Sequence, residues 1–284
     1  MHRNKWSIAA RWGAAFGVVA MVSACGAGGG GNGSSSSGTS QNGGFNPNLP
    51  EPSPNGLLQG NFTVSASPPL TDSTGQQVAY SAFVATDTTF IMVDSACNLF
   101  LGNLGQQGTS STSQLTGTDY PPAYCNGVQK NAGILSTGFT ATGTMPTTAN
   151  SAYALQYQGP PANGTWTLTP QRDNTRSVDL TNLTGATFKS ADGVLTLSFP
   201  SAATISGTMV IDGTSMPVTG SVAVERSSAT STVPLNQYTM MLLINNVKYQ
   251  AYASLDDSGS SSMNALTLLG YAGRNVIQET LVKQ

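Results

Sequence analysis

The stretch Ile205–Val224, ISGTMVIDGTSMPVTGSVAV, predicts two strands joined by a tight turn. Apolar or small residues recur at every second position on both sides of Asp212-Gly213, and a period of two places alternate side chains on opposite faces of a strand. Asp-Gly is a favoured pair for the two-residue turn that matches the twist of antiparallel strands. The stretch therefore predicts an antiparallel hairpin with one buried face.

The segment before this hairpin shows the same period. Phe188–Phe199, FKSADGVLTLSF, gives two short runs around Asp192-Gly193. In the second run we expect Leu195, Leu197 and Phe199 to face the core, with the polar residues between them on the other side.

The segments after the hairpin extend the pattern to the end of the chain. Tyr238–Leu255, YTMMLLINNVKYQAYASL, predicts a second hairpin with Asn245-Asn246 at its turn, because asparagine tolerates positive φ. Its MMLLI run is continuous rather than alternating, so we expect that strand to be buried on both faces. The last two strands are expected at Ala265–Tyr271 and Val276–Val282.

The first half of the folded body is less regular. A polar stretch, Gly102–Thr118, is predicted to be a loop. Strands are expected at Gly60–Ser65, Gln77–Ala85, Phe90–Val93, Gly133–Gly143 and Ser151–Gln158.

Composition agrees with these segments. Only 8% of the residues are charged, and Thr, Ser, Gly and Asn are abundant. A short echo between Gly60–Val64 and Gly164–Leu168 suggests that each opens a module, with a boundary near Gly159-Pro160-Pro161. We predict an all-β, antiparallel body, sandwich-like or barrel-like, in one or two modules, 57–160 and 161–284.

The N-terminus has the layout of an export signal. Arg3, Lys5 and Arg11 precede an apolar segment of ten residues, Trp12–Met21. A membrane-spanning helix needs roughly 17–25 apolar residues, so this segment is too short to span. It leads into Val22-Ser23-Ala24-Cys25, which resembles the lipobox of bacterial lipoproteins. The resemblance implies that residues 1–24 are a signal peptide.

In bacterial lipoproteins the lipobox cysteine receives a diacylglycerol, and the signal is cut before it. The resemblance therefore implies that Cys25 is the lipidated first residue of the mature chain and is anchored in the cell envelope. Two or more acyl chains give stable anchoring. By the sorting rule of this class, Gly26 implies the outer membrane where the cell has one. Residues 25–56 are rich in Gly, Ser and Pro, cannot bury a core, and form a disordered tether with a mean reach of roughly 30 Å.

The two remaining cysteines are Cys97 and Cys125. In an oxidising compartment we expect them to form a disulfide, which would stabilise the fold by about 3–4 kcal/mol in the chain-entropy model. A redox pair or a metal site fits poorly, because the chain has no C-x-x-C and no histidine near them.

Catalytic motifs are scarce. The only histidine is His2, which would leave with the signal peptide. A Ser-His-Asp triad within the mature chain is thereby excluded. There is also no nucleophile elbow, phosphate loop or dinucleotide fingerprint. Asp257-Ser258-Gly259 resembles the short signature of aspartic proteases, but it is a single copy in a polar stretch typical of a turn.

We therefore expect a protein that is not an enzyme and that has no cofactor or metal. The alternative is a histidine-free hydrolase, a protease or glycosidase that uses carboxylates. In outline the chain is similar to surface lipoproteins that carry β-barrels on a tether, such as the transferrin-binding-protein-like group. That likeness concerns the fold alone.

A binding surface is expected beside the disulfide. Tyr120 and Tyr124 flank Pro121-Pro122-Ala123 and adjoin Cys125, so the disulfide would hold both rings on a rigid loop. Besides the membrane that holds the lipid, the expected partner is a protein or a glycan. Gly26–Gln129 contains no Lys or Arg, which disfavours nucleic acid. The other interpretation is that the tyrosines cover the edge of the core.

Overall fold

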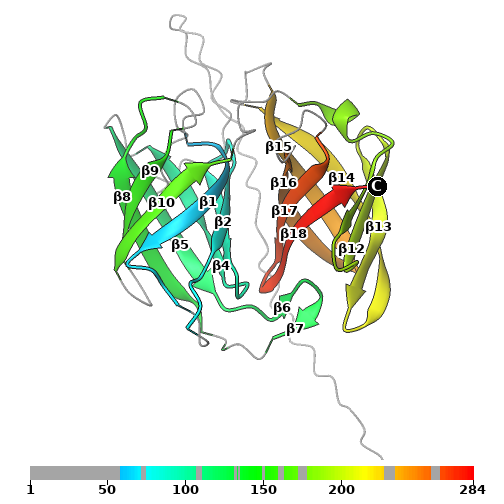
Figure 1. Ribbon diagram of the computed structural model, residues 1–284, viewed down its shortest axis with the longest axis horizontal. Helices are drawn as coiled ribbons and strands as arrows, with labels where there is room; N and C mark the ends of the chain where they lie inside the picture. The colour runs from blue at the N-terminus through cyan, green and yellow to red at the C-terminus, as the bar shows by residue number, and fades with distance from the viewer. Residues whose placement is uncertain are drawn as a thin grey trace, which may run out of the picture. The chain divides into compact units, whose positions relative to one another are not determined.

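The computed structural model describes residues 58–71, 75–106, 111–130, 133, 135–148, 151–158, 163–171, 178–226, 234–256 and 263–284. Strands dominate these residues and build two closed, antiparallel, eight-stranded barrels (Figure 1). The all-β, barrel-like prediction is confirmed. The predicted signal peptide, Cys25 and the tether lie outside the described residues.

The first barrel closes through the pairing of β1 with β2. Val64 of β1 lies opposite Leu168 of β10 on one side and opposite Tyr80 of β2 on the other. Its strand order is β1-β10-β9-β8-β5-β4-β3-β2. The strands are β1 (Gly60–Ser67), β2 (Tyr80–Val84), β3 (Thr89–Asp94), β4 (Leu99–Gln106), β5 (Thr112–Tyr120), β8 (Thr137–Thr144), β9 (Tyr153–Gln158) and β10 (Gly164–Pro170).

Aromatic rings fill much of the first barrel. Trp166 stacks on Tyr157 with ring centroids 4.3 Å apart, and it meets Phe100 and Phe139 edge to face at 5.8 and 5.5 Å. An eight-stranded barrel is just wide enough for side chains to fill. A Cβ on Gly117 would lie 2.6 Å from the Phe139 ring, so glycine gives that ring its space.

The second barrel closes through β11 and β18, where Lys189 lies opposite Val282. Its interior is mainly aliphatic and includes Leu195, Leu197, Leu242 and Leu268. The strands are β11 (Thr187–Ser190), β12 (Leu195–Ser201), β13 (Thr204–Ile211), β14 (Thr214–Arg226), β15 (Pro234–Ile244), β16 (Val247–Asp256), β17 (Ala265–Ala272) and β18 (Asn275–Lys283), and a short 3₁₀ helix, η2 (Leu180–Asn182), precedes them.

The turns of the second barrel agree with the sequence. Asp212 and Gly213 have φ of 47° and 78°, and they join Ile211 of β13 to Thr214 of β14. Asn245 and Asn246 have φ of 48° and 62° between β15 and β16. Both predicted hairpins are confirmed, and Leu195, Leu197 and Phe199 face the core as predicted.

Between β5 and β8 the chain leaves the first barrel as a small hairpin, β6 (Tyr124–Cys125) and β7 (Val128–Gln129), here called the β6–β7 arm. The arm pairs in parallel with β18 of the second barrel, with Tyr124 opposite Asn275. The Asn126 amide clamps it: Nδ2 donates to the Gln278 carbonyl at 2.9 Å, and the Gln278 N–H donates to Oδ1 at 2.7 Å.

Both barrels lie within one compact unit. Phe83 of the first barrel stacks on Tyr252 of the second with ring centroids 6.4 Å apart. Asn61 Nδ2 donates to Ser254 Oγ at 2.8 Å. Within the described part of the chain, no helix is long and apolar enough to cross a membrane.

Three sequence expectations were wrong. Gly102–Thr118 is largely the β4–β5 hairpin rather than a loop, because Leu104, Leu115 and Gly117 face a filled interior while polar residues such as Thr116 and Thr118 face outward. The MMLLI strand is buried on one face only, since Met241 and Leu243 are 45% and 38% exposed. Buried and exposed side chains therefore alternate along this strand, although all of them are apolar.

The third error concerns the module boundary. Gly164–Leu168 lies in β10, which belongs to the first barrel, so a boundary near residue 160 falls before that barrel's last strand. The chain passes to the second barrel between Pro170 and Thr187. The short similarity between Gly60–Val64 and Gly164–Leu168 reflects two neighbouring strands, β1 and β10, whose side chains alternate inward and outward in the same way. It does not mark the starts of two modules.

Candidate functional site

A disulfide joins Cys97 and Cys125, whose Cα atoms lie 5.8 Å apart. Cys97 occupies the turn between β3 and β4 at a φ of 65°, and Cys125 belongs to β6. The bond therefore ties the first barrel to the β6–β7 arm. The sequence predicted this pair once Cys25 was assigned to the lipid and an oxidising compartment was expected.

Tyr120 and Tyr124 take different environments. Tyr120 ends β5 and packs against the apolar cluster that contains Phe83, Tyr252 and Cys97. Its ring thus covers the edge of a core, as the second interpretation of the sequence expected. Tyr124, four residues later on the arm, lines a cavity.

This cavity, here called the Tyr124 cavity, has a volume of about 160 Å³. The arm and the ends of three hairpins of the second barrel form it. The lining residues are Tyr124, Gly127, Ile211, Ile244, Asn245, Val247, Tyr249, Asn275 and Val276.

Gly127 lets the arm reach the β13–β14 turn. Its φ is +77°, and an added Cβ would lie 2.0 Å from the Val210 carbonyl oxygen. The Gly127 carbonyl accepts from the Asp212 N–H at 2.9 Å. The cavity wall therefore depends on glycine at this position.

The chemistry of the Tyr124 cavity is polar without charge. Two phenols and two carboxamides surround an apolar floor of isoleucine and valine. Burial raises the pKa of Tyr249, whereas a hydrogen bond with the Asn275 side chain opposes that shift. The Tyr249 phenol is therefore protonated at neutral pH. Such a site suits a small neutral group with an apolar body and a hydroxyl or carbonyl edge.

The sequence indicated Tyr124 but missed its partners. Asn245 and Asn275 were recognised only as turn residues, and Tyr249 only as part of a strand. Their meeting depends on the pairing of β6 with β18, which joins residues about 150 positions apart. No local pattern signals such a pairing.

Each barrel also contains a pair of neighbouring acids. In the first barrel, burial and then the charge of Asp94 raise the pKa of Asp119 to about 6, and Asp119 Oδ1 is buried without a hydrogen bond. In the second barrel, burial and then the charge of Asp192 raise the pKa of Glu279 to about 7. Glu279 Oε1 is likewise buried without a hydrogen bond.

The partner acid in each pair holds a turn. Asp94 accepts from the N–H groups of Ala96 and Asn98 at 2.9 and 2.8 Å and from Asn98 Nδ2 at 2.7 Å. Asp192 accepts from Ser190 Oγ at 2.7 Å and from the Val194 N–H at 3.0 Å, and its pKa is lowered.

None of the four acids lines the Tyr124 cavity. Asp257 of the protease-like signature lies outside the described residues. Among the residues that are described, no group of three or more His, Cys, Asp or Glu side chains could hold a metal ion.

Comparisons of the chain with protein-family models, with curated proteins and with solved structures each gave no significant match.

Proposed function

We propose that this chain is a lipid-anchored protein of the bacterial cell envelope whose two-barrel body binds a partner and does not catalyse a reaction. The observation that carries the proposal is Val22-Ser23-Ala24-Cys25 at the end of the apolar segment Trp12–Met21. A signal of this type attaches acyl chains to the cysteine, and several acyl chains hold a protein stably on a bilayer. Gly26 directs it to the outer membrane where the cell has one.

The Tyr124 cavity supports a binding role. It offers hydrogen-bonding groups on rigid strands and tight turns, and it lies beside a disulfide that limits motion of the arm. Its lining contains no charged side chain, which favours a neutral protein segment or glycan and disfavours nucleic acid.

The anchor is tested with Cys25→Ser and metabolic labelling with a palmitate analogue. The variant should lose the label and move to the soluble fraction, because no acyl chain can be attached. Ser35→Ala in the tether is the matched control and should keep the label and the membrane location. A Cys25→Ser protein that stays on the membrane with unchanged mass would refute the anchor.

The binding site is tested with Tyr124→Ala and Tyr124→Phe in the full chain, by binding to isolated cell envelopes. Loss of the ring should weaken binding about tenfold or more, the scale of a buried tyrosine contact. Tyr120→Ala is the matched control, because Tyr120 packs in a core cluster and does not line the cavity. Equal binding of the Tyr124→Ala protein, with an unchanged circular dichroism spectrum, would place the site elsewhere.

The hydrolase alternative rests on the acid pair Asp94 and Asp119. Asp119 has the raised pKa of a general acid, but Asp94 already accepts three hydrogen bonds from its own turn. We expect no hydrolysis of peptide or glycan substrates. If the parent chain hydrolyses such a substrate and the Asp119→Asn or Asp257→Asn variant does not, the function is catalysis rather than binding.

A further inference from the structure

The outer surface of the first barrel has an unusual composition along β1, β10, β9, β8 and β5. Side chains that point outward from these five strands are nearly all hydroxyl or carboxamide groups, and none of them is charged. We call this surface the hydroxyl–amide face. It consists of Thr63, Ser65, Ser67, Thr112, Gln114, Thr116, Thr118, Gly138, Thr140, Thr142, Thr144, Ala154, Gln156, Gln158, Thr165, Thr167 and Thr169.

The strand register aligns these groups in rows across the barrel. One row runs from Ser67 through Thr165, Gln156 and Thr142 to Gln114. Neighbouring strands lie about 4.8 Å apart, so adjacent groups in a row are close enough to bind one ligand together. Thr165 Oγ1 donates to Gln156 Oε1 at 3.0 Å, which shows that neighbours in the row do meet.

The described strands of the first barrel expose no charged side chain. Among the described residues of the first barrel, Asp94 and Asp119 point inward, and Asp87 lies in the β2–β3 turn. The strands of the second barrel, by contrast, expose Lys189 and Lys248. Strand propensity favours threonine in both barrels, and the outer surfaces of the two barrels differ in that only the second carries lysine on its described strands.

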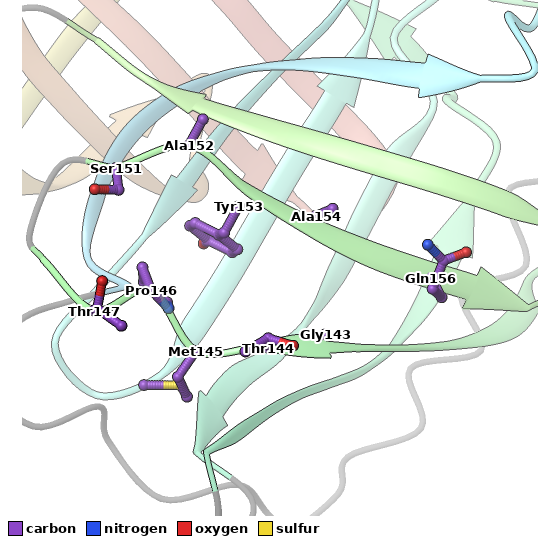
Figure 2. Close-up of a pocket in the computed structure, with 10 residues that line it drawn as sticks. All are labelled: Gly143, Thr144, Met145, Pro146, Thr147, Ser151, Ala152, Tyr153, Ala154 and Gln156. Carbon is purple, nitrogen blue, oxygen red and sulfur yellow. The ribbon is translucent and has the colours of Figure 1, made fainter.

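Two hollows lie on the hydroxyl–amide face along β8. The first has a volume of about 370 Å³ and is lined by Thr116, Gly117, Gly138, Phe139, Thr140 and Gln158. The strands β8 and β9 are paired only as far as Thr142 and Gln156. The second hollow begins where this pairing ends and has a volume of about 460 Å³. Figure 2 shows it between Gly143 and Thr144 on one side and Ala154 and Gln156 on the other.

Polar side chains surround both hollows, whereas the rings of Phe139 and Tyr153 lie beneath them, since each is only 5% exposed and packs in the barrel interior. Sugars present hydroxyl groups around the edge of each ring. Hydroxyl and carboxamide side chains both donate and accept, so they match sugar hydroxyls without a charge.

We propose that the hydroxyl–amide face binds a neutral polysaccharide, whose chain follows β8 across the two hollows. An anionic polymer would require Lys or Arg, which this face lacks. The core of a protein interface would require exposed aromatic or large apolar residues, and the exposed large hydrophobic side chains of the described residues lie on other segments. This surface is separate from the Tyr124 cavity, and the proposal does not depend on that site.

The test is affinity electrophoresis of the full chain in detergent, with gels that contain laminarin, mannan, glycogen, hydroxyethylcellulose or anionic alginate. At least one of the four neutral polymers should retard the protein. Binding measured in solution to that polymer should persist at about 1 M NaCl, where the Debye length falls to about 3 Å. Failure of all four neutral polymers, or binding to alginate alone, overturns the proposal.

Two variants locate the site. Gly138→Arg fills the first hollow, because an added Cβ would meet only the Gly117 carbonyl oxygen, at 3.9 Å. Thr144→Arg enters the second. Each should weaken binding at least fivefold, whereas Thr280→Arg, on an exposed position of the second barrel, should not. Unchanged binding by both hollow variants, with native circular dichroism spectra, overturns the location and with it the proposal.

Discussion

The two barrels have the same number of strands but different interiors and surfaces. Aromatic rings such as Trp166, Tyr157 and Phe100 fill the first, whereas leucine, methionine and valine dominate the second. The first is covered with threonine and glutamine, whereas the second exposes lysine together with Met241 and Leu243. Closure of an eight-stranded barrel therefore requires inward alternation and sufficient volume, but it does not require particular side chains.

The largest expected effect is the loss of a ring from the aromatic interior. Trp166→Ala removes a side chain that contacts Tyr157, Phe100 and Phe139, and it should lower the free energy of unfolding by about 3–5 kcal/mol. Urea denaturation measures this. Leu242→Ala in the aliphatic barrel is the companion variant, with an expected loss of about 2–5 kcal/mol. A Trp166→Ala loss under 1 kcal/mol would show that the rings do not form a packed core.

The disulfide comes next, because it links the first barrel to an arm that pairs with the second. Cys97 and Cys125 are 28 positions apart, and replacing both by serine should lower the free energy of unfolding by about 3–4 kcal/mol. Denaturation with and without reductant gives the same comparison in the native chain. Free thiols at both positions in protein purified without reductant would contradict the bond.

The buried acids give a pH-dependent difference in each barrel. The pKa of Asp119 is raised to about 6 and that of Glu279 to about 7. The folded state therefore favours the protonated form of both carboxyls. Each carboxyl contributes its full stabilisation at a pH below its pKa in the unfolded chain, and this contribution is lost as the pH rises through its pKa in the folded protein. At pH 8, Asp119→Asn and Glu279→Gln should each raise the free energy of unfolding by about 2 kcal/mol.

At a pH below the unfolded pKa of both acids, the same variants should match the parent chain, because the parent carboxyls are then protonated in both states. Asp87→Asn in an exposed turn is the control, and it should have a small effect at either pH. A stabilisation by Asp119→Asn that is equal at low and high pH would show that the charge is not its cause.

The smallest effect on stability is expected from variants that make the surface of the second barrel more polar, like that of the first barrel. Met241→Thr with Leu243→Thr replaces two exposed apolar side chains on β15 and should change the free energy of unfolding by less than about 0.5 kcal/mol. Light scattering at high protein concentration should show less self-association, since an apolar patch is removed. A large loss of stability would mean that these side chains are buried in solution.

Much of the second barrel could be predicted from its sequence. Asp212-Gly213 and Asn245-Asn246 are local signals, since residues at these positions adopt positive φ and the flanking strands alternate. The first barrel was harder, because the stretch that forms most of the β4–β5 hairpin is rich in glycine and polar residues. A glycine that faces a filled interior cannot be told from a loop glycine by sequence alone.

The sequence by itself determined the β class, the main turns and the candidate cysteine pair, and it contains the lipobox-like segment on which the proposed function rests. Tertiary structure alone decided where each barrel closes, that β10 belongs to the first, and that Tyr124 meets Tyr249 and Asn275. The physical reason is range. A turn depends on two or three neighbouring residues, whereas the pairings of β1 with β10 and of β6 with β18 join strands about 100 and 150 residues apart. Closing the first barrel through β1 leaves none of its strands as an unpaired edge, whereas β6 joins the arm to a barrel that β11 and β18 already close.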